Sequence, residues 1–127
     1  MPRKTVQPPG TSSKAPLSLA VRSGDFLYLS GHVPTKDGQV VTGGIGPQTH
    51  QTFKNLIHTL EHAGASLDDV IKVNVFLTDM SDFSGMNEVY REYLPTDPPA
   101  RSTVGTSALA LPGLLIEIEM IAYLGDE

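Results

Sequence analysis

The hydrophobic and polar positions of this chain follow two periods, and each period predicts a kind of element. Residues 17–21 (LSLAV) and 25–31 (DFLYLSG) are short apolar runs on either side of Ser23-Gly24, a pair typical of a tight hairpin turn. Residues 68–79 and 114–124 alternate with period two, which predicts strands, and residues 100–105 are expected to form another strand.

Two further stretches have helical spacing. From Pro47 to Gly64, apolar side chains recur every three or four positions, with proline suited to the first turn and glycine to the end. Residues 81–94 form the second predicted helix, whose buried face is expected to hold Phe83, Met86, Tyr90 and Leu94.

The order of these elements is ββαβαββ, and it indicates a single α+β domain over residues 15–127. We expect a mixed β-sheet with both helices packed on one face. Residues 35–46 are expected to be a loop with a turn at Asp37-Gly38, and residues 1–14, which lack an apolar stripe, an irregular lead-in.

Composition narrows the classes of protein that this domain can belong to. The chain has 127 residues and a formal net charge of −5, which disfavours binding to a nucleic-acid backbone. It has no cysteine, which excludes disulfides, thiolate metal sites and a cysteine nucleophile. No apolar run approaches the roughly 20 residues of a membrane span. We therefore expect a soluble, cytoplasmic protein without membrane or nucleic-acid partners.

Three local motifs have structural as well as functional interpretations. Residues 58–62 (HTLEH) match a zinc-protease pattern, but both histidines point away from the apolar stripe of the predicted helix, so a solvent-facing position is preferred and no metal is expected. Residues 42–46 (TGGIG) match no phosphate-binding fingerprint, and a mobile loop is preferred over an anion cradle. His32 is either a polar pocket residue or a rim residue.

Charged residues on the predicted strands are the main candidates for chemistry. Glu117 and Glu119 share one face of the strand 114–124. If residues 100–105 pair antiparallel with that strand, Arg101 and Thr103 face the level of the two glutamates. A cross-strand ion pair is then one interpretation, and spacing alone favours it. The other is a substrate site in which the guanidinium binds a carboxylate through two parallel hydrogen bonds and a glutamate transfers a proton.

Longer stretches of the chain support the second interpretation. The segments PPARSTVG and LLIEIEMIA resemble a C-terminal signature of Pro-Ala-Arg-Ser followed by Ile-Glu-Ile-Glu, and YLSGHVP and residues 62–90 align as well. From about Ala15 onward the chain thus resembles the RidA (YjgF) family of imine and enamine deaminases. The resemblance implies a chorismate-mutase-like fold and a homotrimer with ligand clefts between subunits. It also implies cofactor-independent hydrolysis of enamines or imines, such as 2-aminoacrylate and 2-iminopropionate, to 2-keto acids and ammonia.

The same resemblance assigns roles to individual positions. It implies that Arg101 clamps the substrate carboxylate and that Glu117 assists the hydrolytic water, with pocket contacts from Ser30, Gly31 and Asn87. Glu119 is expected to be a structural or subunit-contact residue.

Two positions depart from the family pattern. Leu17 replaces a tyrosine and Thr103 a cysteine. Loss of the tyrosine hydroxyl leaves the exact substrate open, so a larger ring-cleavage enamine such as 2-aminomuconate is an alternative. Non-catalytic binding of a small carboxylate also stays open, whereas RNA cleavage or translation inhibition is disfavoured by the charge.

Overall fold

The computed structural model describes residues 3–11 and 15–126, and its centre is a six-stranded sheet. The strand order is β1-β2-β3-β8-β6-β7. The strands span Lys4–Val6 (β1), Ala20–Ser23 (β2), Phe26–Leu29 (β3), Val70–Leu77 (β6), Ala100–Gly105 (β7) and Ile116–Tyr123 (β8). All neighbours pair antiparallel except β6 and β7, which are parallel, so the sheet is mixed as predicted.

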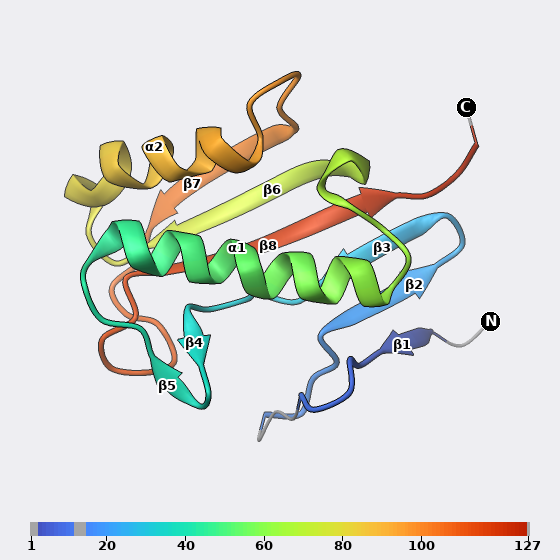
Figure 1. Cartoon of the computed structure of the whole chain (residues 1–127), viewed down its shortest axis with the longest axis horizontal. Coiled ribbons are helices and arrows are strands. Elements are labelled where there is room, and N and C mark those ends of the chain that lie inside the picture. The colour runs from blue at the N-terminus through green and yellow to red at the C-terminus, as the bar shows by residue number, and fades with distance from the viewer. Residues whose placement is uncertain (1–2, 12–14, 127) are drawn as a thin grey trace.

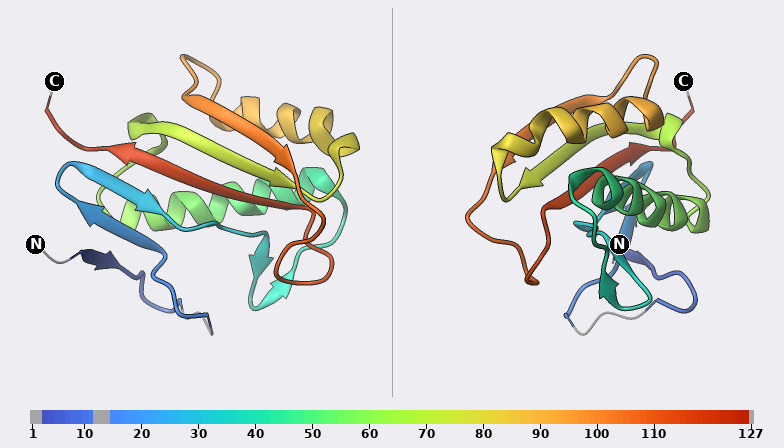
Figure 2. Two further views of the ribbon diagram at one scale, coloured as in Figure 1. Left: turned by 180° about the vertical axis from the view of Figure 1, so that it is seen from behind. Right: turned by 60° about the vertical axis from the view of Figure 1, so that its left-hand side comes forward.

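Both long helices cover the same face of this sheet (Figure 1). Helix α1 spans Ile45–His62, and helix α2 spans Phe83–Tyr93 and connects β6 to β7. Figure 2, which shows the molecule from behind, leaves the other face of the sheet without a helix. The predicted α+β class, with two helices on one face, is therefore confirmed. None of the described helices is long and apolar enough to cross a membrane.

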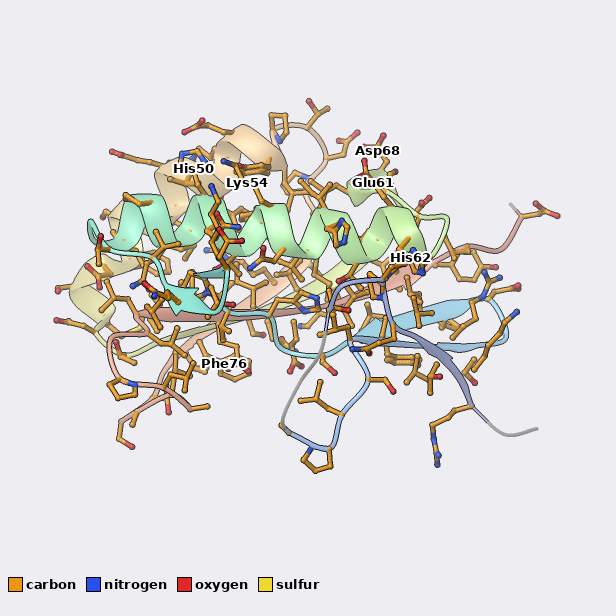
Figure 3. All side chains as sticks on the ribbon, turned by 60° about the horizontal axis from the view of Figure 1, so that its bottom comes forward. His50, Lys54, Glu61, His62, Asp68 and Phe76 are labelled. Carbon is orange, nitrogen blue, oxygen red and sulfur yellow. The ribbon has the colours of Figure 1, made fainter. Side chains whose placement is uncertain are left out.

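The hydrophobic core lies between the helices and the sheet. Alternate residues of β6 and β8 point into it, as the period of two predicts. The largest of its fully buried side chains are Leu27, Phe53, Leu56, Leu60, Leu77, Met86, Ile116, Ile118 and Met120. The intervening side chains of β6 and β8, including Glu117, Glu119 and Phe76, therefore point to the uncovered face (Figure 3).

The expected antiparallel pairing of residues 100–105 with residues 114–124 is wrong. Strand β6 lies between β7 and β8, and β7 runs parallel to it with Val73 opposite Arg101. A strand–helix–strand connection through α2 produces this parallel pair. The position of β6 between β7 and β8 determines which face of the sheet Arg101 and Thr103 occupy.

Smaller differences from the prediction occur in the segments outside the core. The expected lead-in is not irregular throughout, because Lys4–Val6 forms an edge strand on β2; residues 1–2 and 12–14 lie outside the described part. The expected loop contains a small hairpin of Thr35–Lys36 (β4) and Gln39–Val40 (β5), turning at Asp37-Gly38 with positive φ at both residues. Short 3₁₀ turns span Leu67–Asp69 (η1) and Met80–Asp82 (η2).

Candidate active site

Arg101 lies on the helix-covered side of the sheet, against α2. Its Nη1 donates a hydrogen bond of 2.9 Å to Oδ1 of Asn87. The guanidinium carbon lies 4.6 Å from the centroid of the Tyr90 ring and 5.7 Å from that of Phe83. Phe83 is 37% exposed rather than buried as expected, because it lies at the helix start beside this arginine. Among the described residues the guanidinium has no carboxylate partner, so the expected Arg–Glu ion pair does not form within one chain.

An open hollow of about 410 Å³ adjoins the arginine. It lies between the end of α2 and the proline-containing segment before β7. Its lining comprises Asn87, Tyr90, Arg91, Leu94, Pro95, Pro98, Pro99 and Arg101. Two guanidinium groups and an amide over an apolar wall suit a small carboxylate, because planar guanidinium matches carboxylate geometry with two parallel bonds.

Thr103 follows Arg101 on the same face of β7, opposite Val75 of β6. Its Oγ1 is buried and has no hydrogen-bond partner in the described part of the chain, and the same holds for the hydroxyl of Tyr90. Tyr90 was predicted only as a buried residue of the helix and not as a site residue. Its position three residues after Asn87 on a helix, which places both side chains on one helical face, was the available signal.

Glu117 lies on the opposite, uncovered face of the sheet, where it packs against Gly31. A Cβ atom at residue 31 would overlap the Glu117 carboxylate, so this close approach requires glycine. Burial, and to a smaller extent the charge of Glu119, raises the pKa of Glu117 above its ordinary value. Glu119 accepts a hydrogen bond of 3.0 Å from Nδ2 of Asn74, which gives it a structural partner. Of the two glutamates, Glu117 is thus the one suited to proton transfer.

The strand end beside Glu117 is held by a buried histidine. His32 is 5% exposed, and its Nδ1 lies 2.7 Å from the carbonyl oxygen of Ser30. Because a carbonyl only accepts, Nδ1 carries the hydrogen, and Nε2 accepts from Oγ1 of Thr59 on α1 at 2.9 Å. Burial lowers the pKa of His32, which favours this neutral form. His32 is therefore an inner residue that fixes the Ser30–Gly31 peptide, and not a rim residue.

The remaining candidates from the sequence are Ser30, Leu17 and the two histidines of residues 58–62. Ser30 donates through Oγ to the carbonyl of Ser18 at 2.6 Å, so its hydroxyl is used by the fold. Leu17 precedes β2 and its side chain is 45% exposed. His58 and His62 are both exposed, which confirms their solvent-facing position. Within the described ranges, no three His, Asp or Glu side chains form a group that could hold a metal ion.

The candidate residues thus form two clusters on opposite faces of the sheet. Arg101, Asn87 and Thr103 lie on the helix-covered face, and Glu117 with Gly31 lies on the uncovered face. The expectation that Arg101 and Thr103 share a face with Glu117 is wrong, because β7 pairs with β6 in a register that aligns Arg101 with core-facing Val73. One substrate can contact both clusters only if they come from different chains.

The fold is thus a small α+β domain that carries these two clusters on opposite faces of its sheet. A family model described as "Endoribonuclease L-PSP" matches residues 9–124. A solved structure of RidA from an Antarctic Psychrobacter superposes with a TM-score of 0.89 at 38% sequence identity, covering 95% of this chain and 99% of that one. The chain belongs to this family, the RidA (YjgF) family, as its resemblance implied.

Two curated relatives indicate how varied the family is. "Protein mmf1, mitochondrial" of Schizosaccharomyces pombe is 44% identical over 119 residues, covering 92% of this chain and 74% of that protein. A protein of Dermatophagoides farinae named 2-iminobutanoate/2-iminopropanoate deaminase is 38% identical over 111 residues, or 86% of each chain. Because the first relative is named mitochondrial, the cytoplasmic location of this protein stays a prediction.

Proposed function

We propose that the protein hydrolyses 2-imino acids, and the enamines from which they form, to 2-keto acids and ammonia. The observation that carries this proposal is that the chain holds two complementary groups: an arginine with no carboxylate partner among the described residues, and a glutamate whose pKa is raised. Membership of the RidA family, and the deaminase name of the mite relative, support the same reaction. The substrate is an imine or enamine next to a carboxylate, with 2-aminoacrylate and 2-iminopropionate as first candidates.

Arg101 would bind the substrate carboxylate. Asn87 uses one guanidinium N–H, and the two aromatic rings shield the group from solvent, which strengthens its remaining bonds. Charge-assisted hydrogen bonds contribute about 1.5–3 kcal/mol each. Two such bonds would fix the orientation of the imine carbon for attack by water.

Glu117 would move protons during the reaction. An enamine first gains a proton at carbon and loses one from nitrogen to become an imine. Water then adds to the imine carbon, both of its protons pass to the nitrogen, and the C–N bond breaks to leave a keto group and ammonia. A carboxyl group whose pKa is raised can both donate and accept in these steps, and general acid–base catalysis typically contributes about 10²- to 10⁴-fold. No metal or cofactor is needed for this sequence of steps.

We propose further that the working unit is a homotrimer with its sites between subunits. The uncovered face of the sheet carries exposed Phe26, Tyr28 and Val104, and Phe26 contacts both Tyr28 and Tyr123. Exposed large apolar side chains on an uncovered sheet face favour association with further copies. Docking that face of one copy against the arginine side of the next would bring the two clusters together.

The reaction is tested by ammonia release from a panel of amino acids, each converted to its enamine in place by an added oxidase or lyase. We expect faster release of ammonia with the protein than without it for at least one small substrate. The panel includes 2-aminomuconate, because apolar Leu17 stands where the family pattern has a tyrosine. If no substrate in the panel releases ammonia faster than the uncatalysed rate, the proposed reaction is contradicted. Binding of a keto acid in that case would indicate a carboxylate-binding protein without catalytic activity. A parallel incubation with RNA tests for the endoribonuclease activity after which the family is named.

A further inference from the structure

A second hollow, larger than the one beside Arg101, lies at the other end of the sheet. Its volume is about 550 Å³, and it is bounded by β1, β2 and the last turn of α1. Strands β1 and β7 are the two opposite edges of the sheet, so this hollow is separate from the arginine cluster. We propose that it binds a small phosphorylated ligand, a function beyond the deamination proposed above.

The first observation is a pair of like charges placed directly opposite each other. Lys4 on β1 is the register partner of Arg22 on β2, and both face the hollow. Like charges directly opposite each other on two paired strands destabilise a sheet. Within the described ranges neither side chain forms an ion pair, although the protein as a whole has a net charge of −5. A bound anion would convert this repulsion into two favourable contacts.

The second observation is a set of donors that converges on the same space. His62 faces the hollow from the last turn of α1, and Gln7 from the end of β1. The Oε1 atom of Gln7 accepts from the backbone N–H of Leu19 at 3.1 Å, which fixes the amide and leaves its NH₂ group to donate. Within the part of the chain that the structure describes, Arg22 uses only Nε, in a bond of 2.8 Å to the carbonyl of Gly24. Its two terminal nitrogens therefore stay available.

The third observation is that acidic groups are absent from the lining among the described residues. Glu61 precedes His62, but Figure 3 shows it on the other side of α1, beside Asp68, whereas His62 lies nearest to β1 and β2. The floor is apolar, formed in part by Val6 and Leu27. Four donor side chains around one hollow can reach more oxygens than the two of a carboxylate, so a phosphate group fits them better.

Titration of the full-length protein with pyrophosphate tests the proposal, by calorimetry and by amide chemical shifts. We expect saturable binding with one site per chain and shifts confined to β1, β2 and the end of α1. Loss of one charge-assisted contact should weaken binding by about tenfold or more. Lys4→Gln and Arg22→Gln should each show this loss. Lys54→Gln, on the far side of α1 (Figure 3), is the matched control and should bind like the wild type.

Three outcomes would overturn the proposal. One is binding that does not saturate, and another is equal binding by Lys4→Gln and wild type. The third is equal affinity for tricarballylate, since the site would then select charge and not phosphate. Arg22→Gln also loses the bond to Gly24, so its melting temperature is measured; Lys4 is exposed and tests the charge without that loss. Ammonia release is assayed separately, and its failure would leave this result unaffected.

Discussion

Single atoms decide what the two clusters can do. The missing Cβ of Gly31 admits the Glu117 carboxylate to a partly buried position, and that burial raises the pKa of Glu117. On the other face, Asn87 holds Arg101 without neutralising it, because an amide oxygen accepts a hydrogen bond but carries no charge. The result is a carboxyl group with a raised pKa on one face of the sheet, and on the other face a cation with no carboxylate partner in the described part of the chain.

Substitutions of Arg101 and Glu117 should therefore impair different properties, ligand affinity in the first case and turnover in the second. Arg101→Ala should lose affinity for a keto-acid product by about 2–4 kcal/mol, with part of the lost bonding replaced by water. Arg101→Lys should rescue poorly, because an ammonium cannot form two parallel bonds. Glu117→Gln should keep product affinity and lose turnover. Calorimetry and steady-state kinetics on all three variants measure this, and a stable, active Arg101→Ala would contradict the role of the arginine.

The raised pKa of Glu117 also predicts a dependence of stability on pH. A carboxyl group whose pKa is higher in the folded than in the unfolded state stabilises most when protonated, below its unfolded pKa. That contribution is lost as the pH rises through the raised folded value. In acid, Glu117→Gln and its parent should thus have the same melting temperature. As the pH rises, the melting temperature of Glu117→Gln should become higher than that of its parent. The comparison uses the Arg101→Ala background, because in the proposed trimer the guanidinium of an adjacent chain would offset the effect of burial on Glu117. An opposite trend would contradict the assigned direction.

At the scale of elements, the strand end at Ser30 and helix α1 are coupled through His32. Its ring bridges the Ser30 carbonyl and the Thr59 hydroxyl, and its backbone exchanges two hydrogen bonds with Ile118 of β8. The peptide that precedes Gly31 is thereby fixed from the helix side, while Glu117 contacts Gly31 from the uncovered side. The placement of Glu117 therefore depends on packing at α1.

We expect His32→Ala to destabilise the protein by about 2–4 kcal/mol. The substitution leaves a cavity and two buried polar groups without their partner, and each such group costs about 1–3 kcal/mol. His62→Ala, an exposed histidine thirty positions along, is the control and should change stability by less than about 0.5 kcal/mol. Chemical denaturation measures both. Equal stabilities of the two variants would contradict the bridging role of His32.

The elements of the core were predictable from the sequence, as was the hairpin of β2 and β3, but the partner of β7 was not. The period of two in residues 68–79 and 114–124 predicted β6 and β8, and helical spacing predicted α1 and α2, because these patterns are local. The partner of residues 100–105 depends on contacts between distant segments. Choosing β8 in place of β6 moved Arg101 to the wrong face, since alternate strand positions point to opposite sides. The residue types at the candidate site were therefore predictable, whereas their division between two faces was not.

At the scale of the whole molecule, that division determines how the site can be assembled. A single chain offers its arginine on the face covered by α2 and its glutamate on the uncovered face, with exposed aromatic side chains on the same side as the glutamate. In a cyclic trimer, each chain would give its arginine to one neighbour and its glutamate to the other. Three equivalent sites would result, each with the arginine cluster of one chain and the glutamate cluster of an adjacent chain.

Mixed trimers test this arrangement directly. Arg101→Ala and Glu117→Gln are each expected to be inactive, but a trimer that contains both chains has an interface between an intact Arg101 and an intact Glu117. Random assembly of the two variants in equal amounts should restore about a quarter of the wild-type sites, because each site draws one cluster independently from either chain. Unfolding and refolding the variants together, followed by ammonia release, measures the recovery, with each variant refolded alone as the control. Light scattering confirms the trimer in every sample. Activity no greater than the sum of the two controls would show that the clusters do not act across an interface, and a monomer in solution would exclude the shared site altogether.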